Sequence, residues 1–418
     1  MHVKNLCISF TFFFLNEYNC QVGRSWLDDA LEPIYWPLRR TLNEIVKSVI
    51  ENRKATERNN LPKPELSENL EFPCKFSTPR SEKVPQSVHK LRPGDIDLIG
   101  VIGDSLTAGT SVSATNLLEL PAEERGASFA GGGADTWRTR LTLPNILKEF
   151  NPQLSGYATG TSLYIEKAAG LNFAEPAAFS SDMFTFIQLL VQRIMNDPTV
   201  DFRKDWKMIT IMMGHNDFCT ANCNLKNPYD ALIMHAKDLV KVLRFIRDNL
   251  PRTIVNIVPP YDTRLAAGLK DKPYFSDFMH TFYCQCLLGL RFKSKQSVFG
   301  DIIKKWQKLD VMIADLPEFD LEDFTVIAHN FTIGYEVPKT SDGGTDYSLF
   351  AVDCFHFSPS GHARAATDLW NSLMGTSYGR KTVDIDGNKL ICPTEEHPYI
   401  CTKRNSRQCN VAMNKIMN

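Results

Sequence analysis

An apolar segment that runs into Gly103-Asp104-Ser105 constrains the fold more than any other stretch of this chain of 418 residues. Residues 96–102 are apolar apart from one aspartate and one glycine, which is typical of a strand buried on both faces of a parallel sheet. Such a strand ends at the edge of the sheet where open α/β proteins bind their ligands. A helix that begins after Ser105 would add free N–H groups and a dipole that favours negative charge. We therefore interpret Ser105 as a candidate nucleophile, which needs a base, an orienting carboxylate and oxyanion donors.

Candidates for those partners lie in two later segments. Asp353 and His356 are three residues apart, on a loop that enters a helix at Ser358-Pro359. Asp353 is expected to hold His356 in the tautomer that accepts the serine proton. Asn216 follows another apolar strand, and its side-chain amide is expected to donate a hydrogen bond to an oxyanion.

Three ordered segments, 103–106, 214–217 and 353–356, resemble blocks I, III and V of the GDSL/SGNH hydrolases. The surrounding residues are most similar to the phospholipase B branch of that family, over residues 90–375. The resemblance implies a three-layer α/β/α fold of the flavodoxin-like type with a mainly parallel sheet. It also implies a mechanism in which Ser105 is the nucleophile, His356 the base and Asp353 its partner, with no metal and no cofactor.

The oxyanion hole that the resemblance implies uses the Ser105 N–H, the Asn216 side chain and the N–H of a block II residue. Ala177 stands where the family has a glycine. Alanine keeps the N–H donor, but its methyl group disfavours a positive φ. A negative φ would leave the hole intact, whereas a positive φ would count against activity. His215 is a second departure, because a smaller or apolar residue is expected before Asn216.

Other polar residues near these motifs are interpreted as structural. Asp104 is expected to tie loops together by hydrogen bonds, and His215 is expected to belong to the scaffold. His329 and His362 rival His356 as the base, but His362 falls inside the helix that follows the motif, where packing is the simpler role.

Strand-like and helix-like segments alternate along the chain, which predicts a parallel sheet with helices on both sides. The expected strands are 96–102, 206–213, 253–258 and 324–331, and the expected helices are 137–150, 180–195, 227–249, 297–309 and 358–374.

Four regions are expected along the chain. They are a signal peptide at 1–20, an N-terminal helical arm and linker at 21–92, the hydrolase domain at 93–376 and a C-terminal extension at 377–418. The arm is expected to lie outside the catalytic fold. It could cover a sheet edge, occlude the site as a pro-segment, or have no role.

Charge and hydropathy exclude several classes of partner. The chain has 47 basic and 48 acidic residues, so it lacks the excess of positive charge that is typical of proteins that bind nucleic acid. It also lacks a polybasic block that would bind anionic membranes. The apolar run 6–15 is shorter than the roughly 20 residues of a membrane-spanning helix, and it indicates a signal peptide, with an apolar strand or helix as the alternative. Asn330-Phe331-Thr332 is an N-glycosylation sequon. We expect a secreted glycoprotein without a transmembrane anchor.

Eleven cysteines fit an exported, disulfide-bonded protein. A bridge between Cys219 and Cys223 would pin the oxyanion loop, and a bridge from Cys354 to Cys284 or Cys286 would pin the acid/base loop. Metal binding by Cys219 and Cys223 is the rival interpretation, but no second pair of ligands stands at a suitable spacing.

Together these features predict a secreted serine esterase on the acyl esters of glycerophospholipids and lysophospholipids, with transient contact to the lipid surface. The motifs alone specify an ester, and the phospholipid is what the resemblance implies. Two alternatives stay open. One is a carboxylesterase or acetyl esterase on short-chain or carbohydrate esters, and the other is a catalytically impaired lipid-binding relative, which Ala177 favours.

Overall fold

The computed structural model describes residues 26–57, 71–75, 77–269, 272, 274–341, 343–375, 390–406 and 409. One four-stranded sheet within them is parallel throughout, in the order β1 (Ile96–Gly103), β2 (Trp206–Met212), β3 (Thr253–Ile257) and β4 (Phe324–Ala328). β2 and β3 are buried along their whole length, as befits a parallel sheet covered on both faces. The predicted α/β class with a mainly parallel sheet is confirmed.

An irregular segment continues the sheet along the free edge of β1. The Ile99 N–H donates to the Ser155 carbonyl at 3.0 Å, and the Val101 N–H donates to the Leu171 carbonyl at 3.0 Å. The chain therefore leaves β1, runs along its outer edge, and only then crosses to β2. This path is the flavodoxin-like winding that the resemblance implied, and it brings residues 172–178 to the end of β1 that carries Ser105.

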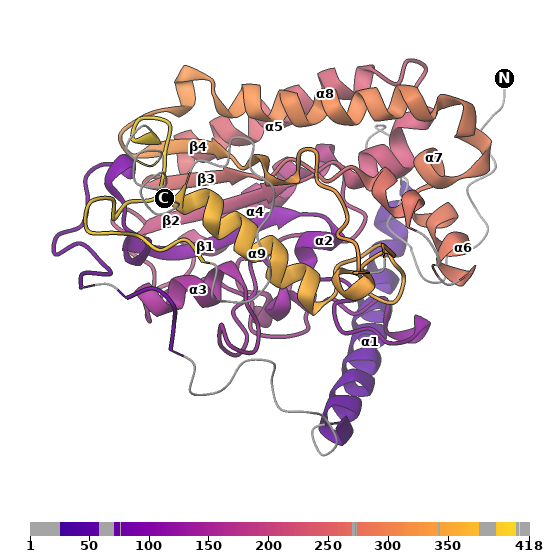
Figure 1. The fold of residues 1–418 in the computed structure, drawn as a ribbon, viewed down its shortest axis with the longest axis horizontal. Helices are drawn as coiled ribbons and strands as arrows, with labels where there is room; N and C mark the ends of the chain where they lie inside the picture. Colours follow the sequence, from indigo (N-terminus) through magenta and orange to yellow (C-terminus); the bar gives the residue numbers. More distant parts are fainter. Residues whose placement is uncertain are drawn as a thin grey trace.

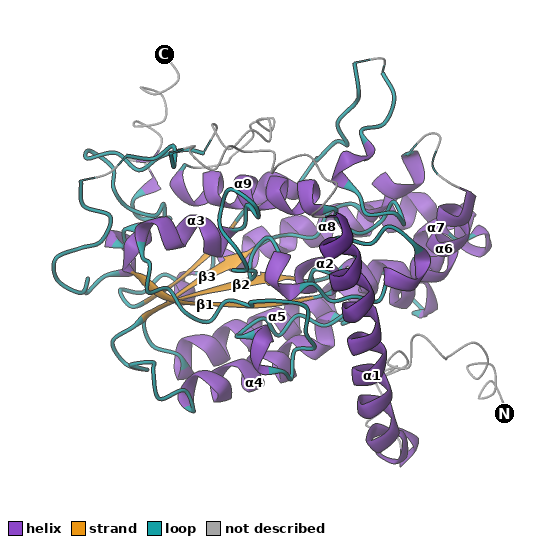
Figure 2. Ribbon diagram, turned by 90° about the horizontal axis from the view of Figure 1, so that it is seen from below, coloured by secondary structure: helices purple, strands orange, loops and turns teal. Residues whose placement is uncertain are grey.

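Helices cover both faces of the sheet (Figure 2). One face carries α3 (Leu143–Phe150) and α9 (Pro359–Met374), and the other carries α4 (Met183–Met195), α5 (Asp230–Asn249) and α8 (Gln296–Ala314). Side chains of the strands alternate between two buried apolar clusters, one on each face. The result is the expected three-layer arrangement.

The main differences from the predicted boundaries have local causes. The prediction of a helix over 137–142 is wrong, because α3 begins at Leu143. Thr142 caps that helix by accepting the Asn145 N–H at 3.2 Å, and Pro144 occupies its first turn. β4 ends at Ala328, short of the predicted 331, because residues 330–332 form a 3₁₀ turn.

Two helices between β3 and α8 were not predicted, namely α6 (Tyr274–Tyr283) and α7 (Gln285–Leu288). α6 lacks a simple apolar stripe, because it buries His280 and exposes Phe278 and Phe282. Together with the N-terminal helix α1 (Trp26–Glu57), these helices lie around the same end of the sheet as α2 (Ser105–Ala108) (Figure 1).

The N-terminal helix and the C-terminal residues are joined to the domain in different ways. One end of α1 projects from the body of the domain (Figure 1), while its Val46 and Ile50 pack against Ala122. A disulfide between Cys74 and Cys392 links the segment after α1 to the C-terminal extension. The predicted signal peptide lies outside the described residues. In the part of the chain that the structure describes, no helix is both long enough and apolar enough to cross a bilayer.

Candidate active site

Ser105 is the first residue of α2, directly after β1. The Asp104 carboxylate caps this helix by accepting the Leu106 N–H at 3.1 Å. Gly109 ends it with a φ of 73°, and a side chain there would meet the Glu124 carbonyl, so this position requires glycine. The turn leaves the half-buried Ser105 at the edge of the sheet, while the N–H groups of Thr107 and Ala108 donate to the Asp104 carbonyl.

His356 lies between Ser105 and Asp353. Its Nε2 is 2.9 Å from Ser105 Oγ, and its Nδ1 is 2.7 Å from Asp353 Oδ2. The other carboxylate oxygen accepts the backbone N–H groups of Phe355 at 3.1 Å and His356 at 3.0 Å. Because an ionised carboxylate can only accept, the imidazole hydrogen is on Nδ1, and the Nε2 lone pair faces the serine hydroxyl.

The Asp353 carboxylate is completely buried. Burial raises the pKa of its carboxyl, but the attraction of His356 and three hydrogen bonds outweigh burial, so the pKa lies below its ordinary value. The carboxylate therefore stays ionised at neutral and mildly acidic pH. Because its folded-state pKa is lowered, the stability it contributes is present at neutral pH and is lost as the pH falls through that folded-state value.

The two rival histidines belong to the core. Burial lowers the pKa of His329 and of His362 to about 3, so both rings are neutral near pH 7. His362 Nδ1 accepts the Phe129 N–H at 3.1 Å, and His329 lies between Ser372 Oγ at 2.7 Å and Asn256 Oδ1 at 3.1 Å. Both rings are therefore committed to structural hydrogen bonds.

Asp104 also ties together the ends of three strands. Its Oδ2 lies 2.6 Å from His215 Nδ1, and His215 Nε2 accepts the Tyr261 N–H at 3.0 Å. A backbone N–H can only donate, so the His215 hydrogen is on Nδ1 and points at Asp104. These residues follow β1, β2 and β3, so the buried string runs along the edge of the sheet that carries Ser105. The family departure at His215 thus has a structural role.

A tight turn, Glu175–Ala178, lies beside the end of β1. The Glu175 N–H donates to the Gly103 carbonyl at 3.0 Å, and the Ala178 N–H donates to the Glu175 carbonyl at 3.1 Å. Pro176 is the second residue of the turn, and Ala177 is the third, with a φ of 64°. This is the pattern of a type II turn, whose third residue needs a positive φ. We call this segment the oxyanion turn.

The favourable case of a negative φ at Ala177 is therefore wrong. Ala177 adopts the left-handed conformation that the family glycine adopts freely, at a cost of roughly 1–2 kcal/mol. Alanine therefore raises the energy of a turn of the type that glycine favours.

Asn216 holds the same turn from the other side. Its Nδ2 donates one hydrogen to the Ala178 carbonyl at 2.9 Å. A side-chain amide carries two donor hydrogens, so the second can serve another acceptor. The segments with Ser105, Ala177 and Asn216 thus meet at the end of β1, joined by the backbone bond to Gly103 and by this side-chain bond.

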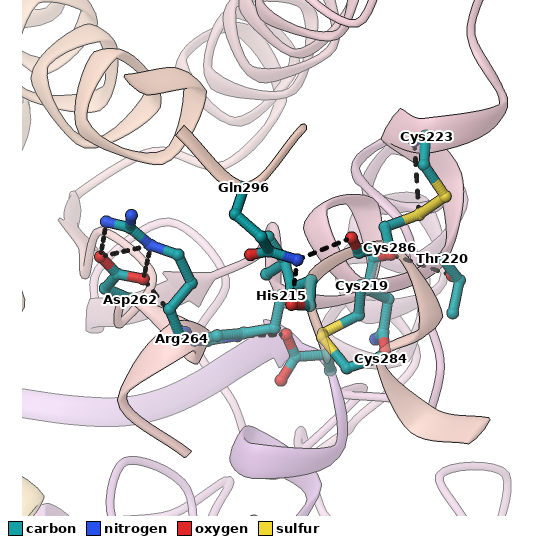
Figure 3. Close-up of a disulfide and its surroundings, with 12 residues drawn as sticks. His215, Cys219, Thr220, Cys223, Asp262, Arg264, Cys284, Cys286 and Gln296 are labelled. Carbon is teal, nitrogen blue, oxygen red and sulfur yellow. Dashed lines mark hydrogen bonds and ion pairs between the residues drawn. A yellow bond between two sulfur atoms is a disulfide. The ribbon is translucent and has the colours of Figure 1, made fainter. Parts of the chain in front are cut away.

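Both predicted disulfide pairings near the site are wrong, as is the metal alternative for Cys219 and Cys223. Cys219 pairs with Cys284 and Cys223 with Cys286 (Figure 3). The segment 217–224 is helical, so the two cysteines, four residues apart, share one face and point toward the same neighbouring segment. Both face α7, and the loop after Asn216 is therefore pinned to α7.

Cys354 is the free thiol among the cysteines that the structure describes. It sits between Asp353 and His356 with a φ of 56°, and it is buried. Burial raises the pKa of its thiol, so it stays protonated at neutral pH.

A second line of serine, histidine and aspartate is buried in the core. Ser180 Oγ bonds to His235 Nδ1, and His235 Nε2 lies 2.6 Å from Asp310 Oδ1. All three residues are at most 3% exposed, and the Trp306 ring stacks on His235. The line joins α5 and α8 to the residues before α4, so its role is structural. Sequence reasoning missed it, because its members form no motif and share only inward positions on their helices.

A largely apolar pocket is lined by residues that neighbour the reacting groups in the chain. Leu106 follows Ser105 in the chain, and Phe355 and Phe357 flank His356. These three side chains line the pocket together with Tyr261, Leu265 and Val337. Walls of this kind suit an apolar group held next to the serine hydroxyl.

Comparisons with known proteins agree on a family. The profile of the GDSL-like lipase/acylhydrolase family matches residues 99–369. The chain is 34% identical over 373 residues to phospholipase B1, membrane-associated, of Mus musculus, covering 84% of this chain and 24% of that protein. It is 36% identical over 342 residues to the Homo sapiens protein of that name, and the match covers 78% of this chain and 22% of that protein. The chain thus spans about a quarter of the length of the curated relatives it matches.

Among solved structures, an extracellular lipase from Streptomyces rimosus matches 64% of this chain and 94% of its own, at 13% identity and a TM-score of 0.29.

Ala177→Gly tests the strain in the oxyanion turn. The change removes the left-handed penalty without moving the N–H, so the free energy of unfolding should rise by about 1 kcal/mol, with kcat unchanged or higher. Chemical denaturation and steady-state kinetics measure the two quantities. A glycine variant less stable than the parent would contradict the assigned conformation.

The double variant Cys219→Ala/Cys284→Ala tests the pinned loop. This bridge spans 65 residues, and its loss should lower the free energy of unfolding by about 2–4 kcal/mol. It should also lower kcat, because the loop after Asn216 is released. The matched control Cys401→Ala/Cys409→Ala removes another disulfide and should lower stability alone. Equal kcat in both double variants would show that pinning does not matter to the site.

Proposed function

Because the chain belongs to the GDSL-like lipase/acylhydrolase family, we propose that it is a serine esterase that removes fatty acids from glycerophospholipids and lysophospholipids. The observation that carries this proposal is the 2.9 Å contact between His356 Nε2 and Ser105 Oγ, with Asp353 behind the ring. The name phospholipase B1 borne by the relatives supports the choice of lipid.

The proposed reaction is acyl transfer in two halves. His356 Nε2 takes the proton of Ser105 Oγ, which attacks the carbonyl carbon of the ester. The carbonyl oxygen becomes an oxyanion held by the N–H groups of Ser105 and Ala177 and by Asn216 Nδ2. When the bond to the leaving oxygen breaks, His356 returns the proton to that oxygen. An acyl group then remains on Ser105.

Water completes the cycle by the same route. His356 takes a proton from a water molecule, whose oxygen attacks the acyl carbon, and Ser105 leaves with the proton as the fatty acid departs. Every step uses side chains and backbone of this chain, so the proposal involves no cofactor and no metal. The apolar pocket beside Ser105 supports an acyl chain as the group that is held.

The same residues bear on the two alternatives, a short-chain or carbohydrate esterase and a catalytically impaired lipid-binding relative. A short-chain carboxylesterase would use the same chemistry, and the pocket of aromatic and aliphatic side chains favours an apolar acyl group over a carbohydrate ester. The impaired relative is favoured by Ala177, because its φ of 64° is the positive value expected to count against activity. Alanine still carries a backbone N–H, so the proposal keeps Ala177 as a donor in a strained turn.

Export is part of the proposal. Four disulfides occur among the described residues, which favours an oxidising compartment. We infer that the chain is secreted or lies outside the cell, although the curated relatives are called membrane-associated. Glycosylation at Asn330 stays a prediction.

α6 supports a transient contact with the lipid surface. Phe278 and Phe282 are one turn apart on this helix, each 58% exposed, and their rings lie 4.8 Å from each other. Exposed aromatic side chains of this kind enter the interface of a lipid layer.

The other side of α6 touches the acid/base loop. His280 Nε2 donates to the Asp353 carbonyl at 2.9 Å, and the Tyr283 ring meets the His356 ring edge to face at 5.9 Å. A lipid layer bound at Phe278 and Phe282 would therefore lie one helix away from the reacting groups.

Ser105→Ala tests the chemistry. Without the nucleophile, release of fatty acid from phosphatidylcholine should fall at least about 10⁴-fold, while the unfolding transition is unchanged. The matched control is Ser180→Ala, which removes the serine of the buried look-alike line and should retain kcat. A folded, disulfide-bonded wild-type protein that is inert on both phospholipids and short-chain esters would refute the proposed function.

The double variant Phe278→Ser/Phe282→Ser tests the lipid contact. Hydrolysis of phosphatidylcholine vesicles should fall about 10-fold or more, because burying each ring in lipid contributes roughly 1.5–3 kcal/mol. Hydrolysis of a soluble short-chain ester should change little. Met312→Ser on α8 is the control, since Met312 is also 58% exposed. A parallel loss on vesicles and soluble ester would argue against a surface role.

A further inference from the structure

Four charged side chains from three distant segments meet beneath the oxyanion turn. Arg39, on α1, bonds to Glu175 and also to Glu123, the latter at 2.7 Å. Arg125 bonds to Glu123 and lies 3.7 Å from Glu175. Both glutamates and Arg125 are at most 3% exposed, and the Arg39 side chain is 16% exposed. Two positive and two negative charges therefore balance in a largely buried cluster.

Glu175 makes this cluster part of the candidate site. It is the first residue of the oxyanion turn, and its backbone bonds to Gly103 and Ala178. Arg125 reaches the preceding backbone as well, because it donates to the Ala174 carbonyl. The position of the Glu175 side chain thus constrains the position of the Ala177 N–H, two residues later.

The balance of the cluster depends on α1. Without Arg39, two buried carboxylates would share the single charge of Arg125. Burial already raises the pKa of Glu175, and Glu123 raises it further, whereas Arg39 and Arg125 lower it. Leaving one member of a buried charge network unpaired is strongly unfavourable, so the turn would be expected to shift toward solvent.

Other contacts hold Arg39 in place. Its guanidinium lies 5.4 Å from the centre of the Trp36 ring, which meets the Tyr164 ring edge to face. Farther along α1, Val46 and Ile50 pack on Ala122, the residue before Glu123.

We propose that Arg39 is a positioning residue for the esterase reaction, through which the N-terminal helix α1 holds the oxyanion turn in its left-handed, donor-presenting form. The helical arm then helps to position the catalytic groups, and it is neither a pro-segment nor a passive extension. This inference rests on the proposed function, but its structural half can be measured without turnover.

The kinetic test compares Arg39→Gln with Arg40→Gln in the full chain. Arg40 is the next residue on α1, with a side chain that is 56% exposed and 3.9 Å from Glu166. Arg39→Gln should lower kcat on the order of 10- to 100-fold with KM little changed, because a displaced donor acts on the transition state. Arg40→Gln should behave as wild type. Adding Glu123→Gln to Arg39→Gln restores the charge balance and should recover part of the lost kcat.

Hydrogen exchange gives the readout that needs no activity. The amides of Glu175 and Ala178 are both hydrogen-bonded in the turn. Their exchange should be faster than in wild type in Arg39→Gln and should keep the wild-type rate in Arg40→Gln. Unaltered exchange of this segment would overturn the proposal, as would a folded Arg39→Gln variant with wild-type kcat. A wild-type protein without esterase activity would instead refute the proposed function, and exchange would still decide the role of Arg39 in the turn.

Discussion

A hydrogen-bonded string from Asp104 through His215 to the Tyr261 backbone fixes the geometry on which the candidate site depends. It joins the ends of three neighbouring parallel strands, which are the points where the chain leaves the sheet and is otherwise free to move. The string is buried, so its bonds are not exchanged for bonds to water. With the strand ends held together, Ser105 and Asn216 occupy fixed positions relative to one another.

The remaining parts of the site are added to this frame by separate restraints. The acid/base loop is shaped by the Asp353 carboxylate, which accepts from two backbone N–H groups as well as from the His356 ring. The loop after Asn216 is clamped to α7 by two disulfides. The oxyanion turn is strained at Ala177, and it is held through Glu175 by charges from α1 and from the loop after α2. Strain of this kind persists only where the surroundings determine the backbone.

Much of this could be predicted from the sequence, and the limits have physical causes. Ser105 and Asn216 follow the parallel strands β1 and β2, and all four residues Ser105, Asn216, Asp353 and His356 stand in motifs that resemble one family. Their meeting was therefore foreseeable. The pairing of Cys219 depended on the helical twist of its segment, which no spacing rule encodes. The contact between Arg39 and Glu175 joins positions 136 apart without any motif, and it exists only because α1 crosses that end of the sheet.

The central claim is that three donors from three segments converge on one oxyanion beside Ser105. The most direct measurement is a crystal structure of the protein after reaction with a long-chain alkyl phosphonate ester, whose phosphonyl oxygen mimics that oxyanion. We expect a covalent bond to Ser105 Oγ, with that oxygen about 2.7–3.1 Å from the N–H groups of Ser105 and Ala177 and from Asn216 Nδ2. A phosphonate on any other residue, or an oxygen turned toward solvent and away from Ala177, would contradict it.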